Sequence, residues 1–283
     1  MTAVQQSRPS TLSIPILEFA GDTTGSITDD SFRADLVAGI KQDGVVVVRN
    51  FPCDGGALVR FGREFGELEP ADPFSPNISP DDPMDWLGHT KAHKKKTWGG
   101  PLALHTAAAH APVEPRLHIM LMLDHGATTS DETTDNGQSR LGRVDDAVER
   151  LVADLGAAAT PILDVLQTTP VSTGFPFPDV PRVEPILTRT ADGSWRFRYW
   201  IRILEYAESG DLSADQRAAF TEFDAALKST AFDVALQTGD LIVLDNHRVA
   251  HGRRSFPAEI VDETGQRIPT TRRIYNVHVF CDL

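Results

Sequence analysis

The sequence is poor in cysteine and in basic residues. It has only two cysteines, Cys53 and Cys281, among its 283 residues. So few cysteines exclude a disulfide framework and a CxxC metal site, and they are typical of a reducing cytoplasm. Lysine and arginine number 27 against 40 acidic residues, which gives a net charge of −13. We therefore expect no polymeric nucleic acid and no membrane surface among the partners, although a small anion can still bind at a local basic site.

Long apolar runs are missing as well. No stretch approaches the length that crosses a bilayer, and residues 1–13 lack the apolar segment of a signal peptide. We therefore expect a cytoplasmic protein without membrane spans. With 283 residues, 41% of them hydrophobic, the chain is long enough to bury a large core. We expect a single domain over residues 1–283.

The hydrophobic pattern predicts many short strands, with helices at the front and in the middle. Strands are expected at residues 45–48, 116–123, 195–204, 241–244 and 272–281, and helices at residues 32–41, 55–65, 144–166 and 213–228. The helical stretch around residues 144–169 reads as an insertion between strands, and residues 72–100 read as a long functional loop. The fold class is therefore mainly β with flanking helices, as in a β-sandwich or jelly roll.

The most informative absence is that of one carboxylate from a metal-binding motif. The facial triad of non-haem iron enzymes is His-x-Asp/Glu followed far downstream by a second histidine. Residues 104–107 read Leu-His-Thr-Ala, so Ala107 occupies the position of the carboxylate two residues after His105. Residues 245–253 read Asp-Asn-His-Arg-Val-Ala-His-Gly-Arg and supply the second histidine, His251. The substitution would open a position on the metal, and a halide ion is the obvious anion to fill it.

Several segments resemble a known family. Residues 43–49 (Asp-Gly-Val-Val-Val-Val-Arg), residues 61–70 (Phe-Gly-Arg-Glu-Phe-Gly-Glu-Leu-Glu-Pro), residues 239–246 and residues 272–274 (Arg-Arg-Ile) carry the resemblance. Together they look like the taurine dioxygenase group of iron(II)/2-oxoglutarate oxygenases. The resemblance covers most of the chain except about residues 145–182. It implies a double-stranded β-helix (jelly roll or cupin-like) that holds iron between two sheets.

The resemblance also implies roles for individual residues. His105 and His251 would bind Fe(II), and Arg273 would grip the far carboxylate of 2-oxoglutarate. Thr133 ends a Ser-Asp-Glu-Thr stretch where the family has Gly-Gly-Asp/Glu-Thr, and it would help to hold the same carboxylate although both glycines are lacking here. Ala107 resembles the vacated position of the aliphatic halogenases, among them a nucleotide halogenase that acts on an adenine deoxynucleotide such as dAMP. The implied cofactors are Fe(II), 2-oxoglutarate, chloride and dioxygen.

A basic segment stands out in this acidic chain. Its lysines are Lys91, Lys94, Lys95 and Lys96. They form either a solvated loop or an electropositive patch beside the site, which would suit a phosphorylated nucleoside as the small-molecule substrate. Trp98, Trp86 or Trp200 could then stack on a base. His110 follows His105 by five residues, so on a strand it faces the other side, and we expect a structural or substrate-contact role for it.

These patterns predict an iron(II)/2-oxoglutarate-dependent halogenase that chlorinates an unactivated sp3 carbon of a small anionic metabolite. Two alternatives remain open at this point. One is a hydroxylase of the same fold, in which water or another residue replaces the carboxylate. The other is a non-catalytic protein that has lost its metal and only binds a ligand. We expect Arg253 and Arg254 to be one ion-pair partner and one exposed residue.

Overall fold

The computed structural model of the chain describes most of the sequence. The described residues are 14–71, 79, 81–91, 100–109, 111, 113–126, 137–172, 183–200, 212–256, 259–261, 266–269 and 272–283. Within these residues, no helix combines the length and the apolar character that crossing a membrane requires.

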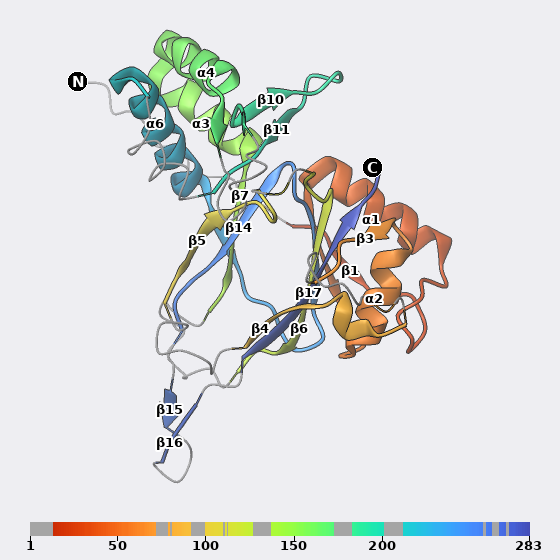
Figure 1. The fold of residues 1–283 in the computed structure, drawn as a ribbon. Coiled ribbons are helices and arrows are strands. Elements are labelled where there is room, and N and C mark those ends of the chain that lie inside the picture. Colours follow the sequence, from red (N-terminus) through yellow and green to blue (C-terminus); the bar gives the residue numbers. More distant parts are fainter. Residues whose placement is uncertain are drawn as a thin grey trace, which may run out of the picture.

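A large sheet forms one side of the β-structure (Figure 1). Its strands run in the order β1 (Ile16–Glu18), β2 (Val45–Arg49), β13 (Leu241–Asp245), β6 (Leu117–Asp124), β17 (Arg273–Phe280) and β3 (Glu67–Leu68), and β4 (Gly88–Lys91) also pairs with β17. Among the described strands of this sheet, β1 and β2 pair in parallel and the other pairs are antiparallel. The expected valine strand is confirmed as β2, which is flanked by strands on both sides and is buried over its four valines.

A smaller sheet faces the large one. It contains β12 (Phe232–Val234), β7 (Ser139–Arg143), β14 (Val249–Arg253) and β5 (Leu102–His105), in this order and all antiparallel. In Figure 1, β5, β7 and β14 lie opposite β4, β6 and β17. Short two-stranded ribbons complete the described strands: β8 (Val171–Ser172) with β9 (Val183–Glu184), β10 (Leu187–Arg189) with β11 (Trp195–Phe197), and β15 (Glu259–Val261) with β16 (Arg267–Pro269). The mainly β fold with two facing sheets, expected as a double-stranded β-helix, is confirmed.

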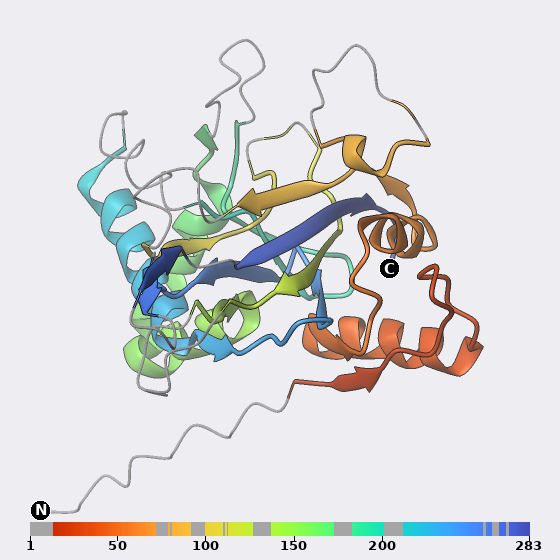
Figure 2. The same ribbon diagram turned by 90° about the horizontal axis from the view of Figure 1, so that it is seen from below.

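Helices cover the outer faces of both sheets (Figures 1 and 2). Helices α1 (Asp30–Asp43) and α2 (Gly55–Arg63) pack on the large sheet. The smaller sheet is covered by α3 (Val144–Leu155), the 3-10 turn η2 (Gly156–Ala158), α4 (Ala159–Thr168) and α6 (Ala214–Thr230). A second 3-10 turn, η1 (Pro83–Asp85), precedes β4. Helices α3 and α4 lie between β7 and β8 in the sequence.

Strand β6 shows how the sequence separates the core from the interior between the sheets. Side chains alternate between the two faces of a strand. Leu117, Ile119 and Leu121 join the core beneath α1 and α2, while His118 and Met120 face the smaller sheet. Full burial of each leucine or isoleucine contributes roughly 1.5–3 kcal/mol. Packing of its outer face against the core therefore stabilises β6, and polar side chains can occupy its inner face.

Two predicted elements differ from the structure. The stretch expected as a loop at residues 72–100 contains strand β4, which pairs with β17 at the sheet edge. The strand expected at residues 195–204 is described as β11 only as far as Phe197, and residues 201–204 lie outside the described residues. The Arg198 N–H still donates to the carbonyl oxygen of Ile186 at 2.9 Å, and its side chain donates to the carbonyl oxygens of Val171 and Glu184. The helix expected at residues 213–228 is confirmed as α6, and it begins with a capping box in which the Ser213 side chain accepts from the Gln216 N–H.

Candidate active site

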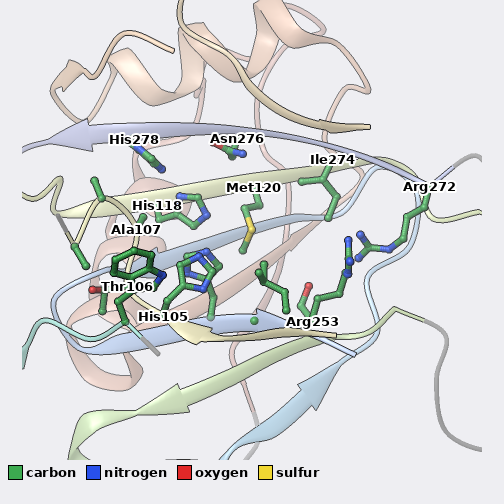
Figure 3. A pocket seen from close by; sticks show the side chains of 17 residues that line it. His105, Thr106, Ala107, His118, Met120, Arg253, Arg272, Ile274, Asn276 and His278 are labelled. Carbon is green, nitrogen blue, oxygen red and sulfur yellow. The ribbon is translucent and has the colours of Figure 1, made fainter. Parts of the chain in front are cut away.

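A cavity of about 430 Å³ lies between the two sheets (Figure 3). Its walls come from β5 and the turn after it, and from β6, β14 and β17. The lining residues are Leu102, His105, Thr106, Ala107, Ala108, Ala109, His118, Met120, Ser139, Trp200, His251, Gly252, Arg253, Arg272, Ile274, Asn276 and His278. In Figure 3, Arg253 and Arg272 lie at one end of the cavity, and Ala107 and His278 lie at the other.

The two histidines that the sequence predicts as ligands meet in this cavity. His105 on β5 is the register partner of His251 on β14. Directly paired residues of antiparallel strands point to the same face, so both rings enter the interior. Their ring centroids are 4.3 Å apart. The pairing brings together two segments that lie far apart in the sequence, and it places their imidazoles side by side.

Both imidazoles are in the form that binds a metal. Burial lowers the pKa of His105 and holds the pKa of His251 well below its usual value. The His105 Nδ1 lies 2.9 Å from the carbonyl oxygen of Ala103. A carbonyl can only accept, so Nδ1 carries the proton and Nε2 has the lone pair. Neutral imidazole is the form that coordinates a metal ion.

Ala107 has a tightly held backbone. Its N–H donates to the Asn246 Oδ1 at 2.6 Å, and its carbonyl oxygen accepts from the Asn246 Nδ2 at 3.0 Å. The preceding Thr106 donates its N–H to the carbonyl oxygen of Tyr199 at 2.8 Å. Ala108 then takes a left-handed backbone conformation with φ of 51°, which costs an L residue about 1–2 kcal/mol. These contacts fix the Ala107 methyl group in the cavity wall.

The cavity wall has no carboxylate among the residues that the structure describes there. Over the whole described part of the chain, no group of three or more His, Cys, Asp or Glu side chains is arranged to hold a metal ion. The paired imidazoles of His105 and His251 are therefore the candidate metal ligands that the structure brings together at this position.

Two arginines form the far end of the cavity. Arg272 is 5% exposed, and it donates to the carbonyl oxygen of Gly137 at 2.8 Å. Burial, followed by repulsion from Arg253, lowers the pKa of Arg272 to about 10, so it remains charged at neutral pH. Arg253 donates to the carbonyl oxygen of Gly100, and its guanidinium lies over the Phe256 ring. A buried cation and a half-buried one that repel each other favour a bound anion nearby.

The sequence-based choice of Arg273 as the 2-oxoglutarate residue needs correction. Arg273 is exposed and is not among the residues that line the cavity, whereas Arg272 is buried and lines it. The alternation along β17 gives the reason. Ile274, Asn276 and His278 share the inward side with Arg272, while Arg273 falls on the other side. Of the two arginines at residues 253 and 254, Arg254 forms an ion pair with Asp233, as expected for one of them, and Arg253 is half-buried and lines the cavity instead of being exposed.

Other predicted site residues lie outside the described residues. These are Lys94, Lys95, Lys96, Trp98, His110 and Thr133. For Lys91 the structure describes the backbone, at the end of β4, where it pairs with Arg273. Two of the tryptophans considered as stacking partners are described. Trp200 lines the main cavity, and Trp86 lines a smaller chamber that adjoins it.

Sequence reasoning missed three polar residues in the cavity wall: His118, Asn276 and His278. The His118 ring stacks on the His251 ring with centroids 4.4 Å apart, and His278 lies beyond it at 4.9 Å. Neither ring nitrogen of His118 has a hydrogen-bond partner among the described residues. The signal was present, because both strands alternate apolar residues with these polar ones. A polar position within a buried strand indicates a side chain directed at a site rather than at the core.

A double-stranded β-helix that places two histidines and an arginine in one cavity defines the class of iron- and 2-oxoglutarate-dependent oxygenases. The match to the taurine catabolism dioxygenase TauD, TfdA family extends over residues 6–275, so the chain belongs to that family. No curated protein matches the chain at a significant level of sequence similarity.

Solved structures show the same fold. A taurine dioxygenase from Burkholderia xenovorans is 17% identical over 96% of this chain and 89% of its own, with a TM-score of 0.61. PvcB from Pseudomonas aeruginosa is 14% identical over 87% and 79%, with a TM-score of 0.60. Asparagine oxygenase (AsnO) is 20% identical over 90% and 79%, with a TM-score of 0.61. At these identities the likeness shows the fold alone.

Proposed function

We propose that this oxygenase is a halogenase that replaces a hydrogen atom on an unactivated sp3 carbon by chlorine. The observation that carries the proposal is Ala107, whose backbone is held by Asn246 beside the His105–His251 pair. Residue 107, two positions after His105, is therefore part of the cavity wall, but its side chain is only a methyl group. Chloride would occupy the space of the missing carboxylate and supply its negative charge.

The residues present fit Fe(II), because two neutral imidazoles face one cavity. Bound iron with 2-oxoglutarate and dioxygen supplies the oxidation: the substrate C–H bond, chloride, 2-oxoglutarate, dioxygen and a proton become a C–Cl bond, succinate, carbon dioxide and water. His105 and His251 hold the metal in this proposal. The stacked ring of His118 keeps His251 in its orientation. The cavity walls then position the target carbon nearer to the halide than to oxygen.

In the same proposal, Arg272 binds the far carboxylate of 2-oxoglutarate, with Arg253 beside it. Their end of the cavity carries the positive charges of a buried and a half-buried arginine, and no acidic residue is among the described residues that line it. The planar fork of a guanidinium matches a carboxylate with two parallel hydrogen bonds. Thr133 remains a proposed further contact to this carboxylate.

Arg272→Ala is expected to raise the 2-oxoglutarate concentration needed for half-maximal turnover. A hydrogen bond to a charged group contributes about 1.5–3 kcal/mol, which corresponds to a roughly 10- to 150-fold increase. Arg273→Ala is the matched control, since it removes the same side chain from the neighbouring exposed position and should change little. Succinate formation at increasing 2-oxoglutarate concentrations measures both. Equal effects of the two variants would contradict this assignment.

The proposed substrate is a small anionic metabolite, with an adenine deoxynucleotide such as dAMP as the leading candidate. Lys91, together with the lysines that follow it, would bind the phosphate, and Trp200 or Trp86 offers a ring for stacking on the base. A free amino acid is the second candidate substrate, because asparagine oxygenase has a similar fold. A cytoplasmic location and a single domain also remain predictions.

Product mass separates halogenation from hydroxylation. Purified protein is loaded with Fe(II) and 2-oxoglutarate and supplied with dAMP or asparagine, with chloride present or with chloride replaced by nitrate. We expect a chloride-dependent product with the mass shift and isotope pattern of one chlorine. A product that gains one oxygen in both salts would establish a hydroxylase instead. Failure to bind stoichiometric Fe(II) would point to the non-catalytic binding protein.

A further inference from the structure

A second chamber of about 200 Å³ adjoins the main cavity. The two share Ala108, Asn276 and His278 in their walls. The chamber therefore opens at the Ala107 end of the main cavity, away from Arg272 (Figure 3). A substrate whose reacting carbon lies beside the histidine pair can extend one group into this chamber while 2-oxoglutarate occupies the arginine end.

Asn276 presents an amide to both spaces. Its backbone pairs with Gly88 on β4 and Met120 on β6, and its side chain shares the inward side of β17 with His278. A Cβ atom added to Gly88 would lie 2.3 Å from the Asn276 Oδ1 and would clash with it. The absence of a side chain at residue 88 therefore leaves room for the amide. Within the described part of the chain, no hydrogen bond satisfies this amide. It has both a donor and an acceptor to offer to a ligand.

Glu69 and Trp86 complete the polar and aromatic walls of the chamber. The Glu69 carboxylate contacts the His278 Nδ1, and the Glu69 N–H donates to the His278 carbonyl oxygen at 2.9 Å. The Trp86 Nε1 donates to the carbonyl oxygen of Ser79 at 3.0 Å. The Arg63 guanidinium lies 5.2 Å from the centre of the Trp86 ring. The carboxylate and the indole are thus held in fixed positions.

We infer that this chamber recognises a flat heterocycle that carries an amino group beside a ring nitrogen, as adenine does. An asparagine amide pairs with such an edge through two hydrogen bonds, accepting from the amino group and donating to the ring nitrogen. Glu69 accepts the second amino hydrogen, and Trp86 offers its aromatic face. An alkylammonium group fits less well, because it has no acceptor for the N–H donors of Asn276. The inference rests on the proposed function and names the part of the substrate that sets specificity.

Binding to enzyme loaded with Fe(II) and 2-oxoglutarate without oxygen tests the inference. The probes are 2′-deoxyadenosine 5′-monophosphate and 2′-deoxyinosine 5′-monophosphate, in which a carbonyl replaces the amino group. For the wild type, calorimetry should give a Kd for the adenine nucleotide that is lower than the Kd for the inosine nucleotide by about tenfold or more. Asn276→Asp removes the donor and should reduce this preference about tenfold or more. In Glu69→Gln the new amide donates to the hypoxanthine carbonyl, so the preference should shift towards the inosine nucleotide.

Asn50→Asp is the matched control, because Asn50 is exposed and its amide contacts only Glu18 in the described structure. Thermal melting of each variant verifies that it is folded. Equal binding of the two nucleotides by the wild type, binding of neither, or an unchanged preference in Asn276→Asp would overturn the inference. Chlorine incorporation is measured separately. Chlorination of both nucleotides at equal rates would refute this inference alone, whereas selective binding of dAMP without chlorination would refute the proposed function alone.

Discussion

Replacing His251 by alanine is expected to abolish both iron binding and 2-oxoglutarate turnover. Iron has two protein ligands in the proposed site, His105 and His251, so the loss of His251 leaves one of them to hold it. The other lining residues described in the cavity include no carboxylate that could substitute. Iron content after anaerobic loading and succinate formation with dAMP measure the two losses. His105→Ala should behave in the same way.

His125→Ala provides the control for a general effect of removing a histidine. His125 bonds to Thr238 and is not among the residues that line the cavity, so its loss should leave iron content and turnover close to wild type. His251 is 7% exposed, and its removal leaves a space that can lower stability. Circular dichroism and thermal melting therefore accompany the measurement. A folded His251→Ala protein that keeps stoichiometric iron and full turnover would show that the metal is held elsewhere.

Much of the outline of this fold can be predicted from short stretches of the sequence. Four successive valines predict β2, and the Ser213–Gln216 capping box predicts the start of α6, because neighbouring residues determine each feature. The histidine pair was also predictable from its two sequence motifs. Both motifs lie in one cavity because His105 pairs directly with His251 across β5 and β14. That register depends on the whole of both sheets.

The choice between two adjacent arginines shows where a motif is insufficient. The pair Arg272–Arg273 indicates an anion-binding residue before the last strand, but not which member faces inward. Alternation along β17 decides in favour of Arg272, and Val277 and Val279 on the opposite side pack into the core beneath α2. Reading these valines as the core side would have identified the inward position from the sequence. The clamp between Asn246 and Ala107 could not be found in this way, since 139 residues separate its partners.

Ala107→Asp is expected to eliminate the chlorinated product. Asn246 holds the backbone of residue 107 through both its N–H and its carbonyl oxygen, so the new carboxylate would project from the same place in the wall. There it would restore the third ligand beside His105 and His251. A carboxylate excludes chloride both by its volume and by its negative charge. Mass spectrometry of the products formed with and without chloride measures the outcome.

Two further substitutions at the same position separate the causes. Ala107→Gly keeps the space open and should retain chlorination, although a more flexible backbone can reduce its rate. Ala107→Asn fills nearly the same volume as aspartate without a charge, so chlorination that is lost in Ala107→Asp but persists in Ala107→Asn would identify charge as the cause. Iron content and 2-oxoglutarate consumption verify that each variant still binds its cofactors.

Hydroxylation is not a required outcome of Ala107→Asp. The cavity that holds the substrate is shaped by residues distant from the metal, such as Asn276, and a single substitution leaves that shape unchanged. If the target carbon is positioned for the halide, it lies too far from the oxygen side for efficient hydroxyl transfer, because reacting atoms must approach within about 3–3.5 Å. Loss of both products therefore agrees with the proposal. Undiminished chlorination by folded, iron-loaded Ala107→Asp would refute it, since the carboxylate and the chloride cannot share one position.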